Sequence, residues 1–183
     1  TPLFKQTKIN LKIGESTKPG TTFPLDPALD SDVGPNSLQR YHLNDNEYFD
    51  LAEKQTPDGR KYPELILKHS LDREEHSLHQ LVLTAVDGGE PSRSCTTQIR
   101  VIVADANDNP PVFTQDMYRV NVAENLPAGS SVLKVMAIDM DEGINAEIIY
   151  AFINIGKEVE QWEFSNTAGR STAHGQTFWK VIQ

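Results

Sequence analysis

Four oxygen-bearing side chains crowd into five positions near the middle of the chain. In VIVADANDNPPVF (101–113) an apolar, alternating run leads into Asp105, Asn107, Asp108 and Asn109, and two prolines follow. Carboxylate, amide and main-chain oxygens are the ligands of hard cations, and Ca²⁺ takes about 6–8 of them. Without a cation, neighbouring carboxylates repel one another. We therefore expect a cation site in a linker that is stiff with calcium and loose without it.

An internal repeat shows what this linker joins. Pro2-Leu3-Phe4 recurs as Pro111-Val112-Phe113, and the same offset of 109, without gaps, relates seven further pairs. These pairs are Glu15 and Glu124, Gly20 and Gly129, Asp30 and Asp139, Asp32 and Asp141, Gly34 and Gly143, Asn36 and Asn145, and Tyr41 and Tyr150. The period has the length of a domain, so the sequence predicts tandem copies of one domain with the linker between them.

Composition narrows the class of protein. The 183 residues carry 26 acidic against 17 basic side chains, a formal charge of −9, which disfavours nucleic acid as a partner and favours cations. Cys95 is the single cysteine, so an internal disulfide framework is excluded. No run of 18 apolar residues and no signal peptide is present, and we expect the chain to be a fragment of a longer protein.

The pattern of apolar residues favours strands. Residues 7–13, 65–69, 79–86, 96–103 and 117–124 alternate apolar with polar or are rich in β-branched side chains, and Gly- and Pro-rich turns separate them. No window shows a clean helical period with caps. The sequence therefore predicts an all-β fold, a β-sandwich of immunoglobulin-like size.

Four motifs then match a known family. The linker DANDNPPVF (105–113), LDREE (71–75), TAVDGGEPSRS (84–94), and the pair DSDVGPN (30–36) and DMDEGIN (139–145) stand in the family's order. The chain resembles two consecutive extracellular cadherin repeats, most closely those of a clustered protocadherin of the gamma group. The resemblance covers residues 1 to about 155 and implies a seven-stranded Greek-key β-sandwich followed by an incomplete second repeat.

The resemblance also implies up to three Ca²⁺ ions at the junction. The first would be held by Glu15, Asp72, Glu74 and Asp108. The second would share Glu15, Glu74 and Asp108 and add Asp105, the carbonyl of Ala106, and Asp141. The third would use Asn107, the carbonyl of Asn109, Asp139, Asp141 and the carbonyl of Asn145. A half-site toward a preceding repeat would consist of Asp30, Asp32, Asn36 and Asp87.

The second copy departs from the pattern. The offset carries Leu71, Asp72 and Glu74 onto Lys180, Val181 and Gln183, and the counterpart of Asp87 would lie beyond the last residue. The third calcium site should therefore be weakened. We expect a complete repeat with its linker at 1–109, the first part of a second repeat at 110–155, and a divergent tail at 156–183 that is poorly ordered unless it supplies substitute strands.

Two alternatives to a calcium-binding module are a zinc site and an enzyme. His76 and His79 have the spacing of a possible zinc pair, but on a strand they would point to opposite faces, and no third ligand completes a site. An enzyme carrying a structural calcium site would need an acid and a nucleophile together, and the sequence shows no such set.

The resemblance implies a calcium-dependent cell–cell adhesion module rather than an enzyme. In the family such repeats stand on the extracellular side of the plasma membrane, anchored by segments outside this chain. The partners implied are another copy on an opposing cell, paired antiparallel, and related protocadherins in cis; no nucleic acid or small-molecule substrate is implied. The alternative that stays open is a truncated, secreted calcium-binding form without adhesive activity.

Overall fold

The computed structural model describes residues 1–32, 34–57, 59–153 and 178–182. By its contacts the chain divides into two units, Thr1–Ala106 and Asn107–Gln183, and each is described by itself. The division falls inside the oxygen-rich linker. Among the described residues no helix is long and apolar enough to cross a membrane.

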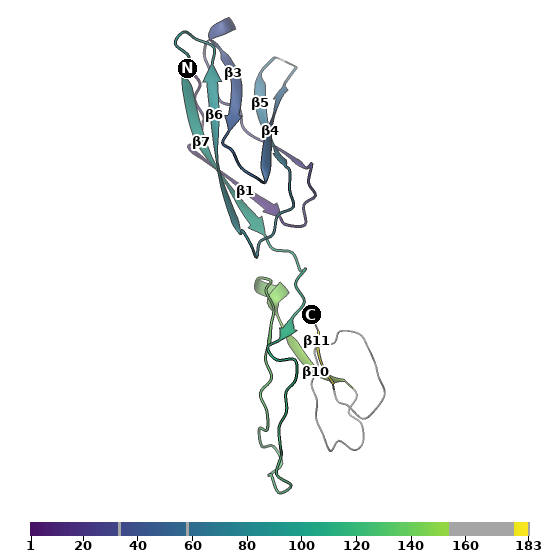
Figure 1. Ribbon diagram of the computed structural model, residues 1–183. Coiled ribbons are helices and arrows are strands. Elements are labelled where there is room, and N and C mark those ends of the chain that lie inside the picture. The colour runs from purple at the N-terminus through teal and green to yellow at the C-terminus, as the bar shows by residue number, and fades with distance from the viewer. Residues whose placement is uncertain (33, 58, 154–177, 183) are drawn as a thin grey trace. The chain divides into compact units, whose positions relative to one another are not determined.

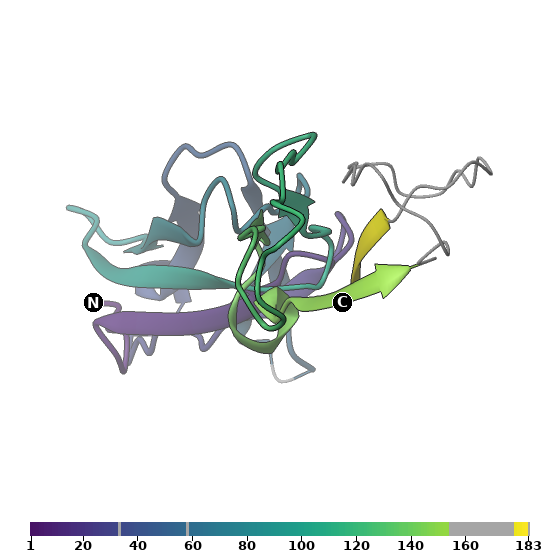
Figure 2. The ribbon, with the colours of Figure 1, turned by 90° about the horizontal axis from the view of Figure 1, so that it is seen from below.

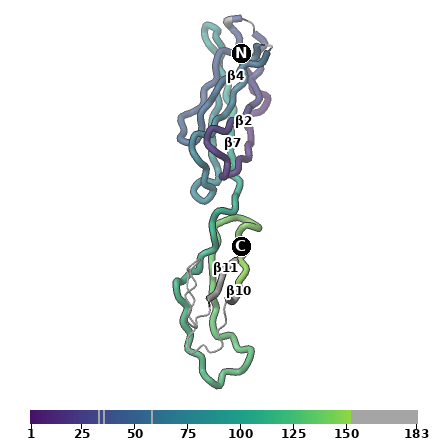
Figure 3. Tube along the Cα trace, turned by 90° about the vertical axis from the view of Figure 1, so that its right-hand side faces the viewer, coloured from purple at the N-terminus to yellow at the C-terminus, as the bar shows by residue number. Residues whose placement is uncertain are grey.

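The first unit holds seven strands and one short 3-10 helix, η1 (Gly34–Asn36). The strands are β1 (Lys8–Gly14), β2 (Thr22–Pro24), β3 (Leu38–Leu43), β4 (Phe49–Gln55), β5 (Lys61–Leu67), β6 (Leu78–Asp87) and β7 (Ser94–Ala104). They form a four-stranded sheet in the order β1-β7-β6-β3 and a three-stranded sheet in the order β2-β5-β4 (Figures 1 and 3). The predicted all-β sandwich with seven strands is confirmed.

The two sheets form because their strands alternate between core and solvent. In β6 and β7 every second side chain is buried, as a strand with one covered face requires. The core between the sheets contains Phe49, Leu65, Leu67, Leu83 and Val101, all almost inaccessible to solvent. Burial of such a side chain contributes about 1.5–3 kcal/mol, so this core holds the unit together.

The pairing of the first strand with the last one positions the linker. β1 lies parallel to β7, with a register that ends at Gly14 opposite Ala104 (Figures 1 and 2). The amide of Glu15 then donates a hydrogen bond to the carbonyl of Ala104 at 3.0 Å. Because the strands run in the same direction, the residues that follow them, Glu15 and Asp105, leave the sheet side by side.

The second unit contains fewer strands. These are β8 (Val112–Phe113), β9 (Ala137–Ile138), β10 (Ile149–Ile153) and β11 (Phe178–Ile182), with the 3-10 helix η2 (Gly143–Ala146) before β10. β8 pairs with β9 and β10 pairs with β11, each pair antiparallel. The described core is small and centres on Phe113, Tyr118 and Ala137.

Equivalent hydrogen bonds in the two units support the repeat. The amide of Ala28 donates to the hydroxyl of Tyr41 at 2.9 Å, and 109 residues later the amide of Ala137 donates to that of Tyr150 at 2.9 Å. Both units also have a glycine of positive φ at the start of the 3-10 helix, Gly34 at 63° and its counterpart Gly143 at 62°. The sequence offset therefore corresponds to the same local geometry, including a backbone conformation that favours glycine.

The strand predicted at 117–124 is wrong: no strand forms there. Its counterpart in the first unit is β1, which is ordered by pairing with β7. Among the described residues of the second unit, no strand pairs with 117–124. An isolated strand leaves its backbone groups without partners, so apolar alternation alone did not suffice to make one here.

The tail was expected to lack order unless it supplied a strand. Residues 156–177 and 183 lie outside the described residues. Residues Phe178–Ile182 form β11, which pairs with β10. In the first unit the counterpart of β10, β3, pairs with β6. β11, from the divergent tail, thus pairs with β10 in the way that β6 pairs with β3 in the first unit.

The buried hydroxyl of Tyr41 offers a test of this architecture. Tyr41→Phe removes the acceptor of the Ala28 amide and should lower the free energy of unfolding by about 1–3 kcal/mol, because that N–H is left unsatisfied in a buried place. Urea denaturation checks this. Tyr62→Phe, on the outer side of β5, is the matched control, and an equal loss in both variants would contradict the assignment.

Candidate metal centre

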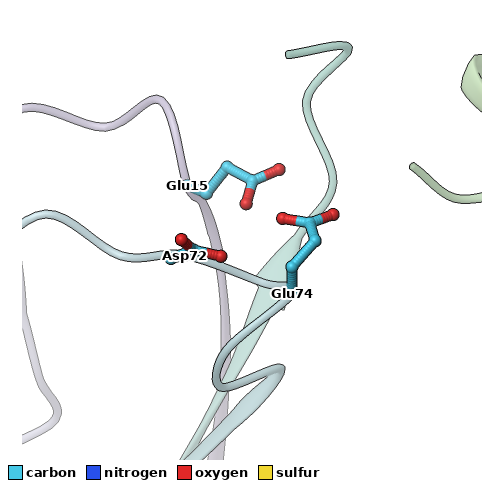
Figure 4. Close-up of side chains that lie close together, drawn as sticks. All are labelled: Glu15, Asp72 and Glu74. Carbon is cyan, nitrogen blue, oxygen red and sulfur yellow. The ribbon is translucent and has the colours of Figure 1, made fainter. Parts of the chain in front are cut away.

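Three carboxylates from separate parts of the first unit converge beyond the ends of its strands. Glu15 follows β1, whereas Asp72 and Glu74 lie in the loop between β5 and β6. One oxygen of each lies within 4.8 Å of the others. In Figure 4 the carboxylates of Glu15 and Glu74 point toward each other, with that of Asp72 beside them. Residues nearly sixty positions apart thus form one acidic group.

Glu15 is the most constrained member of this group. Only 6% of its surface is exposed. The amide of Arg73 donates to its Oε2 at 2.7 Å and the amide of Ala106 donates to its Oε1 at 2.5 Å. Hydrogen bonds from two backbone amides fix the carboxylate in place. These two contacts were not foreseen from the sequence.

Arg73 is a further residue that the sequence reasoning missed. Its Nε donates to Oδ1 of Asp105 at 2.6 Å, and a terminal guanidinium nitrogen bonds the carboxylate of Glu74. Arg73 stands inside the LDREE segment, so the motif contained the signal. Its positive charge offsets part of the repulsion within the acidic group.

A second acidic group of the first unit contains Asp30, Asp32 and Asp87, with oxygens within 4.8 Å of one another. Oδ1 of Asp87 accepts bonds from the amides of Gly89 and Arg93, at 3.2 and 2.7 Å. Three carboxylates held this close together attract a cation.

The remaining predicted ligands belong to the second unit. Asp141 is 7% exposed, and its Oδ1 accepts bonds from the backbone amide and the side-chain amide of Asn109, at 3.2 and 3.0 Å. The side-chain amide of Asn109 also donates to Asp108 at 3.0 Å, and the amide of Asp141 donates to Asp139 at 3.0 Å. Asn107 is exposed in the linker, and Asn145 is half-buried in η2.

Two carboxylate oxygens lack a hydrogen-bond partner although they are buried. They are Oδ2 of Asp30, in the first unit, and Oδ2 of Asp141, in the second. Such an atom is costly to bury unless something positive meets it. The potential metal ligands here are carboxylate, amide and carbonyl oxygens, without a thiolate. This set of ligand atoms fits Ca²⁺ better than Zn²⁺. The individual ligand roles, including those of Asn36 and the main-chain carbonyls, stay predictions.

His76 and His79 do not point to opposite faces of one strand, so that expectation is wrong. His76 precedes β6 instead of lying on it, and its ring centroid is 6.0 Å from that of His79. The ring of Tyr48 lies 4.6 Å from that of His79, so the histidines belong to an aromatic cluster. Within the described residues, none of the acidic or histidine groups that could hold a metal includes either histidine.

This cluster predicts a pH dependence. Burial lowers the pKa of His79 below its ordinary value of 6.5, and the charge of His76 lowers it further. The unfolded chain then binds a proton at a higher pH than the folded one, so stability should fall as the pH drops below about 6.5. In EDTA, urea midpoints should decrease at acid pH, and His79→Gln should flatten that trend. His42→Gln is the control and should keep the trend of the parent. An equal decrease of the urea midpoint in the parent and in His79→Gln would contradict the role of His79.

The contacts of Arg73 predict that its substitution changes both the stability of the chain and its response to calcium. Arg73→Gln should lower the free energy of unfolding in EDTA by about 1–3 kcal/mol, because Glu74 and Asp105 lose a charged donor. The more negative group should bind Ca²⁺ more tightly, so the calcium-induced rise in melting temperature should increase. Lys18→Gln, an exposed turn residue, serves as control. A smaller calcium-induced rise in Arg73→Gln than in the parent would overturn the argument.

Comparisons with known proteins agree with this geometry. Residues 9–104 match the cadherin domain. Human protocadherin gamma-B2 is 81% identical over 162 residues, which cover 88% of this chain and 17% of that protein. Human protocadherin gamma-B3 is 69% identical over 176 residues, or 96% of this chain and 19% of that protein.

A solved protocadherin structure is also similar to this chain. Extracellular cadherin domains 1–5 of protocadherin gamma-B2 match with a TM-score of 0.82 at 67% identity, covering 85% of this chain and 30% of that one. The chain spans less than a fifth of the length of the two curated relatives. The resemblance drawn from the motifs is confirmed: the chain belongs to the cadherin superfamily, within the gamma group of the clustered protocadherins.

Proposed function

We propose that this chain is a calcium-dependent adhesion module, in which Ca²⁺ stiffens the linker between the two units. The observation that carries the proposal is the acidic group of Glu15, Asp72 and Glu74, assembled within 4.8 Å. Two backbone amides hold Glu15 in place within it. Carboxylates brought together and positioned in this way are what a hard cation needs.

The proposed ligand sets follow the family motifs. Glu15, Asp72, Glu74 and Asp108 would hold one ion, and Glu15, Glu74, Asp105, Asp108, Asp141 and the carbonyl of Ala106 a second. Asn107, Asp139, Asp141 and the carbonyls of Asn109 and Asn145 would hold a third.

Calcium would act on the linker and not on the adhesive contact itself. A flexible linker must be ordered when consecutive repeats bind a partner together, and that ordering costs affinity. Ca²⁺ ions bound at the linker would order it before the partner binds, so binding would no longer include that cost. Extracellular calcium modules have dissociation constants of about 10⁻⁴–10⁻³ M, so such a site is filled outside cells.

The partner in this proposal is another copy of the same protein on an opposing cell, paired antiparallel, with related protocadherins in cis. Support comes from the family membership and the resemblance of the linker motifs. The location would be the extracellular side of the plasma membrane, with the anchor in segments outside this chain.

Calorimetry on one linker residue tests the calcium site. Ca²⁺ should bind to the parent chain in the millimolar range and raise its melting temperature. Asp108→Asn should weaken binding about tenfold or more, because a charged ligand becomes a neutral one of the same shape. Asp116→Asn, an exposed residue of the second unit, is the matched control and should bind as the parent does.

The adhesive part needs a separate readout. Sedimentation of the chain with and without calcium should show self-association that depends on Ca²⁺ and is lost in Asp108→Asn. Calcium binding without any self-association would favour the secreted, non-adhesive form. If the parent bound no calcium at all, the proposed module would be refuted.

A further inference from the structure

The four-stranded sheet of the first unit has an unusual charge pattern for an acidic chain. Its strands β1, β7, β6 and β3 are described in full, and their one acidic residue is Asp87, which is buried. Lys8 and Lys12 on β1 and Arg40 on β3 are exposed, and Arg100 on β7 is half-buried at an outward position. The outer face of this sheet is therefore basic although the chain carries a formal charge of −9.

Three of these cations are neighbours. β1 pairs with β7 so that Lys8 lies opposite Gln98, Asn10 opposite Arg100 and Lys12 opposite Ile102. At a rise of about 3.3 Å per residue the two lysines attach to the backbone about 13 Å apart, with Arg100 between them on the next strand. We call Lys8, Lys12 and Arg100 the basic triad.

A groove runs beside the basic triad. It has a volume of about 430 Å³ and is lined by Lys8, Gln80, Leu81, Val82, Gln98, Ile99 and Arg100. Nε of Arg100 is buried there and has no hydrogen-bond partner. The lining thus combines two cations, two side-chain amides and three aliphatic residues, and it offers hydrogen-bond donors without a competing carboxylate.

We propose that this face binds a sulfated polysaccharide. A chain of sulfated sugars brings repeated anionic groups for Lys8, Lys12 and Arg100, and hydroxyl groups for the two glutamine amides. Arginine forms paired hydrogen bonds with such oxyanions, and Lys meets them as a point charge. A polyanion also gains affinity from released counterions, as it does with nucleic acids.

Charge complementarity favours this occupant over a second copy of the chain. The three-stranded sheet, the other broad face of the unit, has mixed charges, with Asp50, Glu64 and Lys54 at its outward positions. The two acidic groups of the first unit lie at or beyond the ends of strands and are the candidates for calcium. No acidic sheet face of this unit is therefore available to cover the basic triad.

Retention on immobilised heparin, in millimolar calcium with a sodium chloride gradient, tests the proposal. The full chain should be retained on heparin and released from chemically desulfated heparin at much lower salt. The variant Lys8→Gln, Lys12→Gln, Arg100→Gln should bind heparin about tenfold or more weakly, with a shallower dependence on salt, because three charge contacts are lost. Lys54→Gln, one charge on the other sheet, should elute close to the parent.

Two results would overturn the proposal. One is equal retention on heparin and desulfated heparin. The other is absence of heparin binding together with a loss of self-association in the triple variant, which would make this face a contact between copies. Melting temperatures of all variants show whether they fold, and single Lys8→Gln and Lys12→Gln substitutions at exposed positions replace the triple variant if Arg100→Gln destabilises the sheet.

Discussion

The parallel pairing of the first strand with the last is the constraint on which the candidate site depends. β1 and β7 end together at Gly14 and Ala104, so Glu15 and Asp105 emerge from the same end of one sheet. The backbone amide of Ala106 then reaches the carboxylate of Glu15. The linker therefore begins with its direction and its first oxygens fixed by the sandwich, and a change in the β1–β7 register would separate them.

Electrostatics is the second constraint, because a folded first unit must hold like charges close together. Glu15, Asp72 and Glu74 gain from their proximity only if positive groups compensate them. Backbone amides and Arg73 supply part of that compensation within the unit. Oδ2 of Asp141 in the second unit is buried and has no hydrogen-bond partner. The proposed Ca²⁺ ions would supply positive charge at both places.

In the first unit the clustered acidic side chains and the exposed basic ones lie in different parts of the fold. Its clustered carboxylates lie at or beyond strand ends, where loops converge, while the outer face of the four-stranded sheet carries Lys8, Lys12 and Arg100 with no outward-facing acid. Strand ends and sheet faces are independent in sequence, since loops supply the first and alternate strand positions the second. One domain can therefore present a cation site and an anion-attracting surface without the two neutralising each other.

The sequence by itself determined the repeat, the motifs and four of the seven strands of the first unit, β1, β5, β6 and β7. The offset of 109 pairs Tyr41 with Tyr150, and the structure gives both hydroxyls an equivalent hydrogen bond from an alanine amide, because a tandem copy keeps local geometry. Only the tertiary structure decided the features that depend on contacts between residues far apart in the sequence. It left 117–124 without a strand, placed the His76 ring near that of His79, and brought Arg73 to Asp105. Alternation records which face of a strand is apolar, but convergence of distant residues depends on which strands pair and where each ends.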